Sequence, residues 1–212
     1  MTADASPAAG AATPPLFLAD DGRLADPRPG DGVVLDGPEG RHAATVRRLG
    51  PGERVDLTDG AGLRLVTTVR AATRDRLDLV VVRRERDQEP APRLVVVQAL
   101  AKGDRGELAV ELLTEVGADE VVPWSASRSV VEWRGERGAK ALARWRATAR
   151  EAAKQSRRTR LPVVTEPATT VRIAERLRDA ALGLVLDSAG TVPLASVEPP
   201  PAGDVVLVVG PE

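Results

Sequence analysis

The clearest alternation of apolar and polar positions lies in the middle of the chain. A valine-rich run over residues 94–99 is typical of a strand buried on both faces. A helical spacing of apolar residues follows, and it predicts a helix whose inward face carries Ala109, Leu112, Leu113 and Val116. Asp104 and Glu107 have capping-box spacing at its start, and Gly117 stands where a helix ends. With the apolar run over residues 120–124, the stretch predicts a strand–helix–strand unit.

A long basic helix is predicted next. Its inward stripe is made mostly of small residues, namely Leu142, Trp145, Ala149, Ala152, Ala153 and Ser156. From Arg137 to Arg160 there are nine Lys or Arg residues against one acid, Glu151. A solvated helix face accounts for such a charge run, and so does a surface that contacts nucleic-acid phosphates. Composition alone leaves both interpretations open.

The N-terminal part has a different pattern. Short strands separated by turn signals are predicted over residues 16–18, 32–36, 54–58, 63–70 and 76–83. Their close spacing predicts a small β-barrel over residues 16–84, after a tail at residues 1–15 that has little to bury. One helix interrupts the strands, from about Glu39 to Leu49, with His42, Val46 and Leu49 on one face. A joint with two prolines then leads to the region from residue 93 onward.

Strands and helices alternate again after Pro162. The predicted elements are a strand at residues 163–164, a helix capped by Thr169 or Thr170, a buried strand at 183–187 and a last strand at 205–209. The helix would carry Val171, Ala174, Leu177 and Ala181 on its inward face. This order predicts an α/β domain with a mostly parallel sheet. Such sheets bind ligands beyond the carboxyl ends of their strands, so the short loop after residue 209 leads us to expect a natural protein that continues.

Composition excludes several classes of function. The chain has no cysteine and a single histidine, which excludes disulfides, thiolate metal sites and an ordinary zinc site. No apolar run reaches the length of a membrane span, and no signal peptide begins the chain; with the absence of cysteine this favours a cytoplasmic protein. Walker, G-x-G-x-x-G and G-x-S-x-G motifs are missing, which disfavours an NTPase, a dinucleotide enzyme or a hydrolase.

A series of short motifs, in order and spacing, resembles one known family. The motifs are His42-x-x-x-Val46-Arg47-Arg48, Gly50-Pro51-Gly52, Asp59-Gly60, Lys102-Gly103-Asp104-Arg105, Glu115-Val116-Gly117-Ala118, Ser127-Arg128-Ser129, Trp145, Glu151-Ala152, Gln155-Ser156, Arg158, Pro162 and Gly210-Pro211-Glu212. From about Leu16 to Glu212 the chain resembles the RsmE family of 16S rRNA (uracil-N3)-methyltransferases, in the SPOUT superfamily. The family pattern continues with Gly-Gly and a Leu-Gly-x-Arg-x-Leu-Arg loop, both beyond Glu212.

The resemblance implies a fold and a reaction. The fold would be a PUA-like barrel followed, over residues 93–212, by a SPOUT domain with a trefoil knot, incomplete at its C-terminal end. Such a domain binds S-adenosylmethionine and forms a homodimer. The reaction would methylate N3 of a uridine near the decoding centre of 16S rRNA, within the 30S subunit, without a metal or a membrane. Two rival functions remain, namely a non-catalytic RNA-binding or ribosome-assembly protein of this fold and a knotted methyltransferase that acts on tRNA.

The resemblance also assigns residues to roles. Arg128 is the candidate catalytic residue, contacting base or phosphate, although a plain surface arginine is the alternative. Cofactor contacts fall on two strand-end loops, at Leu186, Asp187, Ser188, Gly210, Pro211 and Glu212. RNA contacts fall on His42, Arg47, Arg48, Gln155 and Arg158. For His42 a structural role is equally compatible, and for Gln155 and Arg158 so are helix capping and solvation. No residue is assigned as the general base beyond the possibility of Glu212.

The tryptophans raise one further expectation. Three are present, and exposed tryptophans can stack on nucleobases. Trp145 lies on the inward stripe of the basic helix, so we expect it in the core. Trp133 lies in a loop among charged residues and is the tryptophan that we expect to be exposed.

Overall fold

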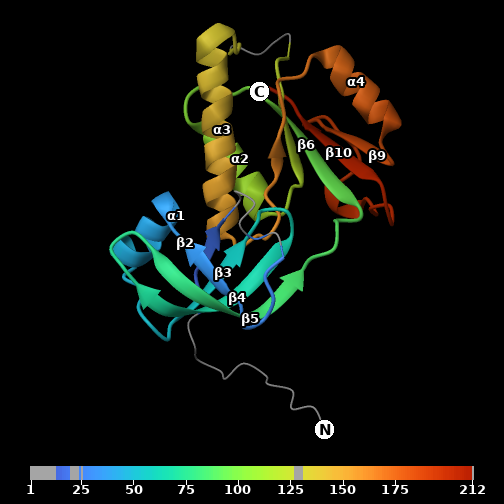
Figure 1. The fold of residues 1–212 in the computed structure, drawn as a ribbon. Helices are drawn as coiled ribbons and strands as arrows, with labels where there is room; N and C mark the ends of the chain where they lie inside the picture. The colour runs from blue at the N-terminus through green and yellow to red at the C-terminus, as the bar shows by residue number, and fades with distance from the viewer. Residues whose placement is uncertain (1–12, 20–23, 25, 127–130, 212) are drawn as a thin grey trace. The chain divides into compact units, whose positions relative to one another are not determined.

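The computed structural model describes residues 13–19, 24, 26–126 and 131–211 (Figure 1). Most of the tail expected at residues 1–15 therefore lies outside the described part. The chain divides into two compact units. The N-terminal unit contains the residues up to 59 together with residues 63–86, and the C-terminal unit contains residues 60–62 together with residues 87–212.

The N-terminal unit is a five-stranded sheet with a short helical segment. Its elements are β1 (Leu16–Leu18), β2 (Gly32–Leu35), helix α1 (Gly37–Arg41), the π-helical turn η1 (His42–Val46), β3 (Arg54–Thr58), β4 (Leu63–Ala72) and β5 (Leu77–Arg86). The strand order is β1-β3-β4-β5-β2, antiparallel except for the parallel pair β1 and β3. The predicted strands are confirmed. Within the described residues β1 and β2 do not pair, so the barrel is open between them.

The helical segment of this unit differs from the prediction. A single helix to Leu49 with Val46 facing inward is wrong, because the segment ends as a π-helical turn and the Val46 side chain is 67% exposed. Ala43 is the buried residue. The backbone of this segment packs closely against the end of β2 at Gly40, where a Cβ atom would lie 2.5 Å from the carbonyl oxygen of Leu35. That backbone contact fixes the rotation of the helix, and a spacing of apolar residues cannot reveal it.

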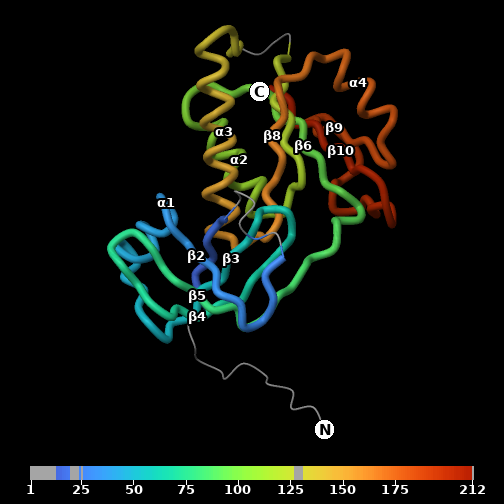
Figure 2. The backbone as a smooth tube through the Cα atoms, in the orientation of Figure 1, coloured from blue at the N-terminus to red at the C-terminus, as the bar shows by residue number. Residues whose placement is uncertain are grey.

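The C-terminal unit is a parallel sheet with helices on both faces. Its elements are β6 (Arg93–Ala99), α2 (Arg105–Glu115), β7 (Glu120–Trp124), α3 (Gly135–Gln155), β8 (Val163–Val164), α4 (Thr170–Asp179), β9 (Leu182–Leu186), the 3₁₀ turn η2 (Leu194–Ser196) and β10 (Asp204–Val209). The strand order is β8-β7-β6-β10-β9, and every pairing is parallel. Helices α2 and α3 cover one face and α4 covers the other, while Figure 2 follows the backbone from β8 across β6 to β10 and β9. The predicted α/β class is confirmed.

Each face of this sheet has its own apolar core. On the α2–α3 face, Trp145 and Leu142 pack against Val110 and the strand residue Val121. On the α4 face, the core is formed by Ile173, Val95, Val97, Val122, Val206 and Val208. The stripe predicted for the long helix is confirmed except at Ser156, which is exposed. Trp145 is 2% exposed, as expected of a core residue.

Three burial predictions in this unit are wrong. Helix α2 buries Gly106, Val110 and Thr114, whereas Leu112 and Val116 are more than half exposed. The rotation of α2 follows from Gly106, where a Cβ atom would lie 2.9 Å from the indole of Trp145. Helix α4 is capped by Thr169 as predicted, but it buries Ile173 and leaves Val171 exposed. Strand β9 is a sheet edge rather than a buried strand, and Val185 on it is 63% exposed.

Candidate functional site

Three strand ends meet at one edge of the parallel sheet. Val209 of β10 pairs with Gln98 of β6 on one side and with Leu186 of β9 on the other. The loops that follow these strands therefore leave the sheet side by side. After β6 the chain proceeds toward β7 and β8, whereas β10 and β9 lie on the opposite side of β6. This is a topological switch point, which is where open parallel sheets bind ligands.

The predicted cofactor residues lie at this edge. Leu186 is 41% exposed at the end of β9. In the loop after it, Asp187 Oδ1 accepts a hydrogen bond from the Ala189 amide at 2.8 Å, with Ser188 between them. Gly210 and Pro211 follow β10, and the space around Gly210 is open. The structure thus brings these loops together, although Glu212 lies outside the described residues and the binding roles stay predictions.

The candidate catalytic Arg128 also lies outside the described residues. The loop that contains it begins after β7, at the same edge of the sheet. At the start of this loop the Trp124 carbonyl accepts a hydrogen bond from the Leu100 amide at 3.0 Å, and the Ser125 amide donates to the Ala168 carbonyl at 3.2 Å. The role of Arg128 therefore stays a prediction.

A pocket of about 460 Å³ opens where α2 begins. It is lined by Ala101, Gly103, Asp104, Gly106, Glu107, Val131, Trp133, Ala141, Arg144 and Trp145. Trp133 is half-buried rather than exposed, and its ring meets that of Trp145 edge to face, with centroids 4.9 Å apart at 82°. Glu107 Oε1 pairs with Arg144 Nε at 3.2 Å. The pocket combines aromatic rings with groups of both charges.

Asp104 does not cap α2, so the capping-box prediction is wrong. Its side chain makes no capping hydrogen bond, and within the described part of the chain its carboxylate has no hydrogen-bond or ion-pair partner. Glu107, the other half of the predicted box, is held by Arg144. Among the described residues, Asp104 is therefore a carboxylate without a partner in the pocket wall, which a local spacing rule could not reveal.

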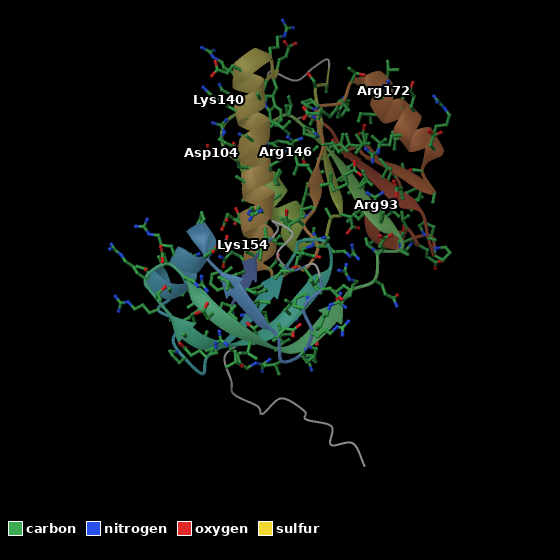
Figure 3. All side chains as sticks on the ribbon, viewed as in Figure 1. Arg93, Asp104, Lys140, Arg146, Lys154 and Arg172 are labelled. Carbon is green, nitrogen blue, oxygen red and sulfur yellow. The ribbon has the colours of Figure 1, made fainter. Side chains whose placement is uncertain are left out.

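Gln155 and Arg158 lie at the opposite edge of the sheet. Helix α3 runs from the end of β7 back to the start of β8, and Figure 3 shows Lys154 at its far end, away from Asp104. The two edges are separated by the length of β7, about 15 Å for five residues. The structure thus does not place these two residues beside the cofactor candidates of the same chain.

Arg158 is held by the turn that precedes β7. Its Nη1 donates to the carbonyl oxygens of Thr114 at 2.9 Å and Ala118 at 2.6 Å, and its Nη2 lies 3.4 Å from Asp119 Oδ1. Burial lowers the pKa of the Arg158 guanidinium, and the Asp119 carboxylate partly offsets this effect. A guanidinium stays protonated in proteins, so its charge is retained. In contrast, Gln155 is exposed.

Most cations of the basic helix are already paired. The carboxylate partners are Glu136 for Lys140, Glu107 for Arg144, Glu166 for Arg146 and Glu151 for Lys154. Just after the helix, the Arg160 guanidinium donates to the backbone carbonyls of Asp87 and Gln88. These pairings support the interpretation of a solvated helix face for much of this charge run.

The N-terminal unit carries exposed arginines that are not paired with carboxylates among the described residues. His42 is half-buried against Phe17, with ring centroids 5.7 Å apart at 82°, which favours the structural alternative for its role. Arg47 and Arg48 are exposed, and within the described residues neither has a carboxylate partner. Arg48 adopts a left-handed backbone conformation, with φ of 55°.

Two further exposed arginines, which the sequence reasoning missed, lie at the same end of this unit. Arg70 sits at a register shift of β4, and Arg74 lies in the turn between β4 and β5. The Thr45 hydroxyl, just before Arg47, donates to the Arg74 carbonyl, which places the turn beside η1. We define the four as the arginine end: Arg47, Arg48, Arg70 and Arg74. A β-bulge cannot be recognised from a run of strand-forming residues, so nothing in the sequence indicated that Arg70 would join Arg47 and Arg48.

Among the described residues, no group of three His, Asp or Glu side chains is arranged to hold a metal ion. Of the helices in the described part of the chain, none has the length and apolar character needed to cross a membrane.

Comparison with known families defines the class of protein. A family described as an RNA methyltransferase domain matches residues 87–212, and one described as an RNA methyltransferase PUA domain matches residues 35–82. The chain is therefore built as an RNA methyltransferase with an N-terminal PUA domain. The ribosomal RNA small subunit methyltransferases E of Mycobacterium bovis and Mycobacterium tuberculosis are each 45% identical to it over 190 residues, covering 88% of this chain and 72% of theirs. The chain belongs to the ribosomal RNA small subunit methyltransferase E family, which confirms the predicted family and enzyme class.

Solved structures agree with this assignment. The ribosomal RNA small subunit methyltransferase E of Neisseria gonorrhoeae, solved bound to S-adenosyl methionine, has a TM-score of 0.75 and 25% identity, covering 94% of this chain and 80% of that one. A probable rRNA-methyltransferase from Porphyromonas gingivalis has a TM-score of 0.69 and 29% identity, covering 93% and 80%.

Proposed function

We propose that this chain methylates N3 of a uridine in 16S rRNA near the decoding centre, within the 30S subunit and with S-adenosylmethionine as the methyl donor. The observation that carries the proposal is the 45% identity to the mycobacterial relatives, which runs over 190 residues. The choice of uridine N3 rests on the ordered motifs, from His42 to Gly210. An rRNA substrate of this kind places the reaction in the bacterial cytoplasm.

The residues at the sheet edge fit S-adenosylmethionine. This molecule has no phosphate, so it needs no glycine-rich phosphate loop. The Asp187 carboxylate is exposed and suits the ribose hydroxyls, while the partly exposed Leu186 suits the adenine ring. Backbone groups of Gly210 and Pro211 complete the contacts. When bound, the donor supplies a methyl group on a sulfonium centre. The trefoil knot and the homodimer of the SPOUT superfamily belong to the same proposal.

The same proposal gives roles to the RNA-contacting residues. Arg128 contacts the base or an adjacent phosphate, next to the donor. Arg47 and Arg48, in the N-terminal unit, contact phosphates. His42 helps to position them, because its ring packs against Phe17. Gln155 contacts RNA away from the cofactor edge. Arg158 acts indirectly at the same end of the sheet, because its guanidinium holds the turn before β7 in place.

The direct test is methyl transfer to 30S subunits that lack the modification. Labelled S-adenosylmethionine is supplied, and the product nucleosides are identified by mass spectrometry. The chain is assayed beside a version extended to the stop codon of its reading frame. We expect at least one of these two proteins to produce 3-methyluridine in 16S rRNA. Methylated tRNA instead would support the tRNA rival, and rRNA binding without any product would support the non-catalytic rival.

Loss of the exposed arginines should weaken RNA binding in a salt-dependent way. For the double variant Arg47→Ala with Arg48→Ala, the slope of log affinity against log salt concentration for a 16S rRNA fragment should fall by about 2, or about 1 per lost phosphate contact. The measurement is a filter-binding titration at several salt concentrations. Arg83→Ala is the matched control, because Arg83 is also exposed but is already paired with Glu85 at 2.6 Å. Equal slopes for both proteins would remove these residues from the RNA interface.

A further inference from the structure

The pocket at the start of α2 has no role in the function described so far. A uridine must leave its base stack to be methylated, and an extruded base needs a pocket that holds it. Ala101, in the wall of this pocket, follows the end of β6 by two residues, so the pocket lies at the same sheet edge as the cofactor candidates. On the basis of the proposed function, we propose that this pocket receives the target pyrimidine and that Asp104 accepts the proton from its N3.

The walls of the pocket suit a flat heterocycle. Trp133 is half-buried and supplies the aromatic surface, whereas Trp145 is buried and supports the Trp133 ring from the core. Stacking on such a ring is the usual way that proteins hold unpaired bases. The edge-to-face contact between the two indoles fixes their orientation. Gly106 contributes by its lack of a side chain, because a Cβ there would displace the Trp145 indole. The volume of about 460 Å³ falls in the range of small-ligand pockets.

The polar groups of the pocket match the edge of uracil. Its N3–H is a hydrogen-bond donor between two carbonyl acceptors. Ionised Asp104 is an acceptor only, and it has no other partner among the described residues. Arg144 lines the same pocket and can donate to a neighbouring carbonyl oxygen. Cytosine has an acceptor at N3 instead, so the same carboxylate would repel it.

Asp104 is also placed to act in the reaction. The N3 proton passes to a carboxylate oxygen of Asp104, and the N3 lone pair forms the bond to the methyl carbon. The carbon–sulfur bond breaks at the same time, so that a neutral thioether leaves. Negative charge delocalised onto the uracil carbonyls is stabilised by the Arg144 guanidinium.

Other carboxylates near this edge are less suited to the role. Glu107 is paired with Arg144, which holds its charge in an ion pair. The Asp187 carboxylate already accepts a hydrogen bond from the Ala189 amide within its own loop. Asp104 is thus the carboxylate that remains without a partner in the described part of this edge.

Base selectivity tests the pocket without any need for catalysis. The probe is a short oligoadenylate with one central uridine or cytidine, and the readout is quenching of tryptophan fluorescence. We expect the native chain to bind the uridine probe about tenfold more tightly than the cytidine probe. Asp104→Asn should remove or invert this preference, because an amide can donate to N3 of cytosine. Asparagine is also a good N-cap residue, so the fold should be kept, which a thermal melt checks.

The matched control is Glu111→Gln. Glu111 is an exposed carboxylate two turns further along α2, outside the pocket. We expect Glu111→Gln to keep the preference for uridine. An Asp104→Asn protein that kept this preference, or a Glu111→Gln protein that lost it, would overturn the assignment of Asp104.

Kinetics on unmodified 30S subunits test the proton transfer. Asp104→Asn should lower the turnover rate by about 100-fold or more, with unchanged affinity for S-adenosylmethionine. Its residual rate should rise about tenfold per pH unit, because it then depends on N3 ionising in solution. A native-like rate in this variant would overturn the catalytic role. A native chain without any methyl transfer would instead contradict the proposed function, and the binding experiment would still decide the role of the pocket.

Discussion

Replacing Glu120 with alanine is expected to lower the free energy of unfolding by about 3 kcal/mol. Glu120 begins β7 and is only 6% exposed. Its Oε2 pairs with Arg93 Nη2 at 2.9 Å and its Oε1 with Arg176 Nη2 at 2.7 Å. The carboxylate thus ties β6 to α4 across β7. Without it, two cations would be left near each other at the protein surface without their shared partner.

Urea denaturation measures this loss directly. The control is Glu175→Ala, which breaks the exposed pair between Glu175 and Arg172 on α4. That pair should contribute less than about 1 kcal/mol, because exposed ion pairs are screened by water. Similar losses in the two variants would show that burial of Glu120 adds nothing to stability.

Replacing Arg158 with alanine is also expected to lower the free energy of unfolding by about 3 kcal/mol. The Ala118 carbonyl would lose the Arg158 donor, the Thr114 carbonyl would keep only the Gly117 amide, and Asp119 would lose a cation. Arg158→Lys should recover only part of the loss, because an ammonium cannot reproduce the planar fork. Methyl transfer by the folded fraction should stay within about threefold of native.

Thermal melts followed by transfer assays well below the melting temperature separate the two roles of Arg158. An unchanged melting temperature together with a large loss of transfer would assign Arg158 to RNA instead of the turn. Gln155→Ala is the companion variant, because Gln155 is exposed at the same end of α3. It should leave stability nearly unchanged.

The strands and the parallel class were predictable because they depend on local patterns. Valine-rich runs such as residues 94–99 occur in strands buried on both faces, and the structure has that strand in the centre of the sheet. The rotation of α2 was not predictable in this way. It depends on Trp145, which lies on another helix 39 positions after Gly106 and packs directly against it.

The candidate site was predictable only as far as general topology reaches. Loops after parallel strands gather at one edge, so the positions of Asp187 and Gly210 followed from the element order. The partners of charged residues did not follow. The sequence points Arg158 toward RNA because this arginine ends a basic helix and matches the family pattern. Only the fold shows its guanidinium on the carbonyls of Thr114 and Ala118.

The contact between Gly106 and Trp145 bears on how related sequences can vary. A side chain at position 106 would overlap the indole, so the two positions are constrained as a pair rather than singly. We expect relatives with alanine or serine at position 106 to carry a smaller residue at position 145. Substitutions at these sites would then appear together in evolution, and glycine would be retained wherever the tryptophan is kept.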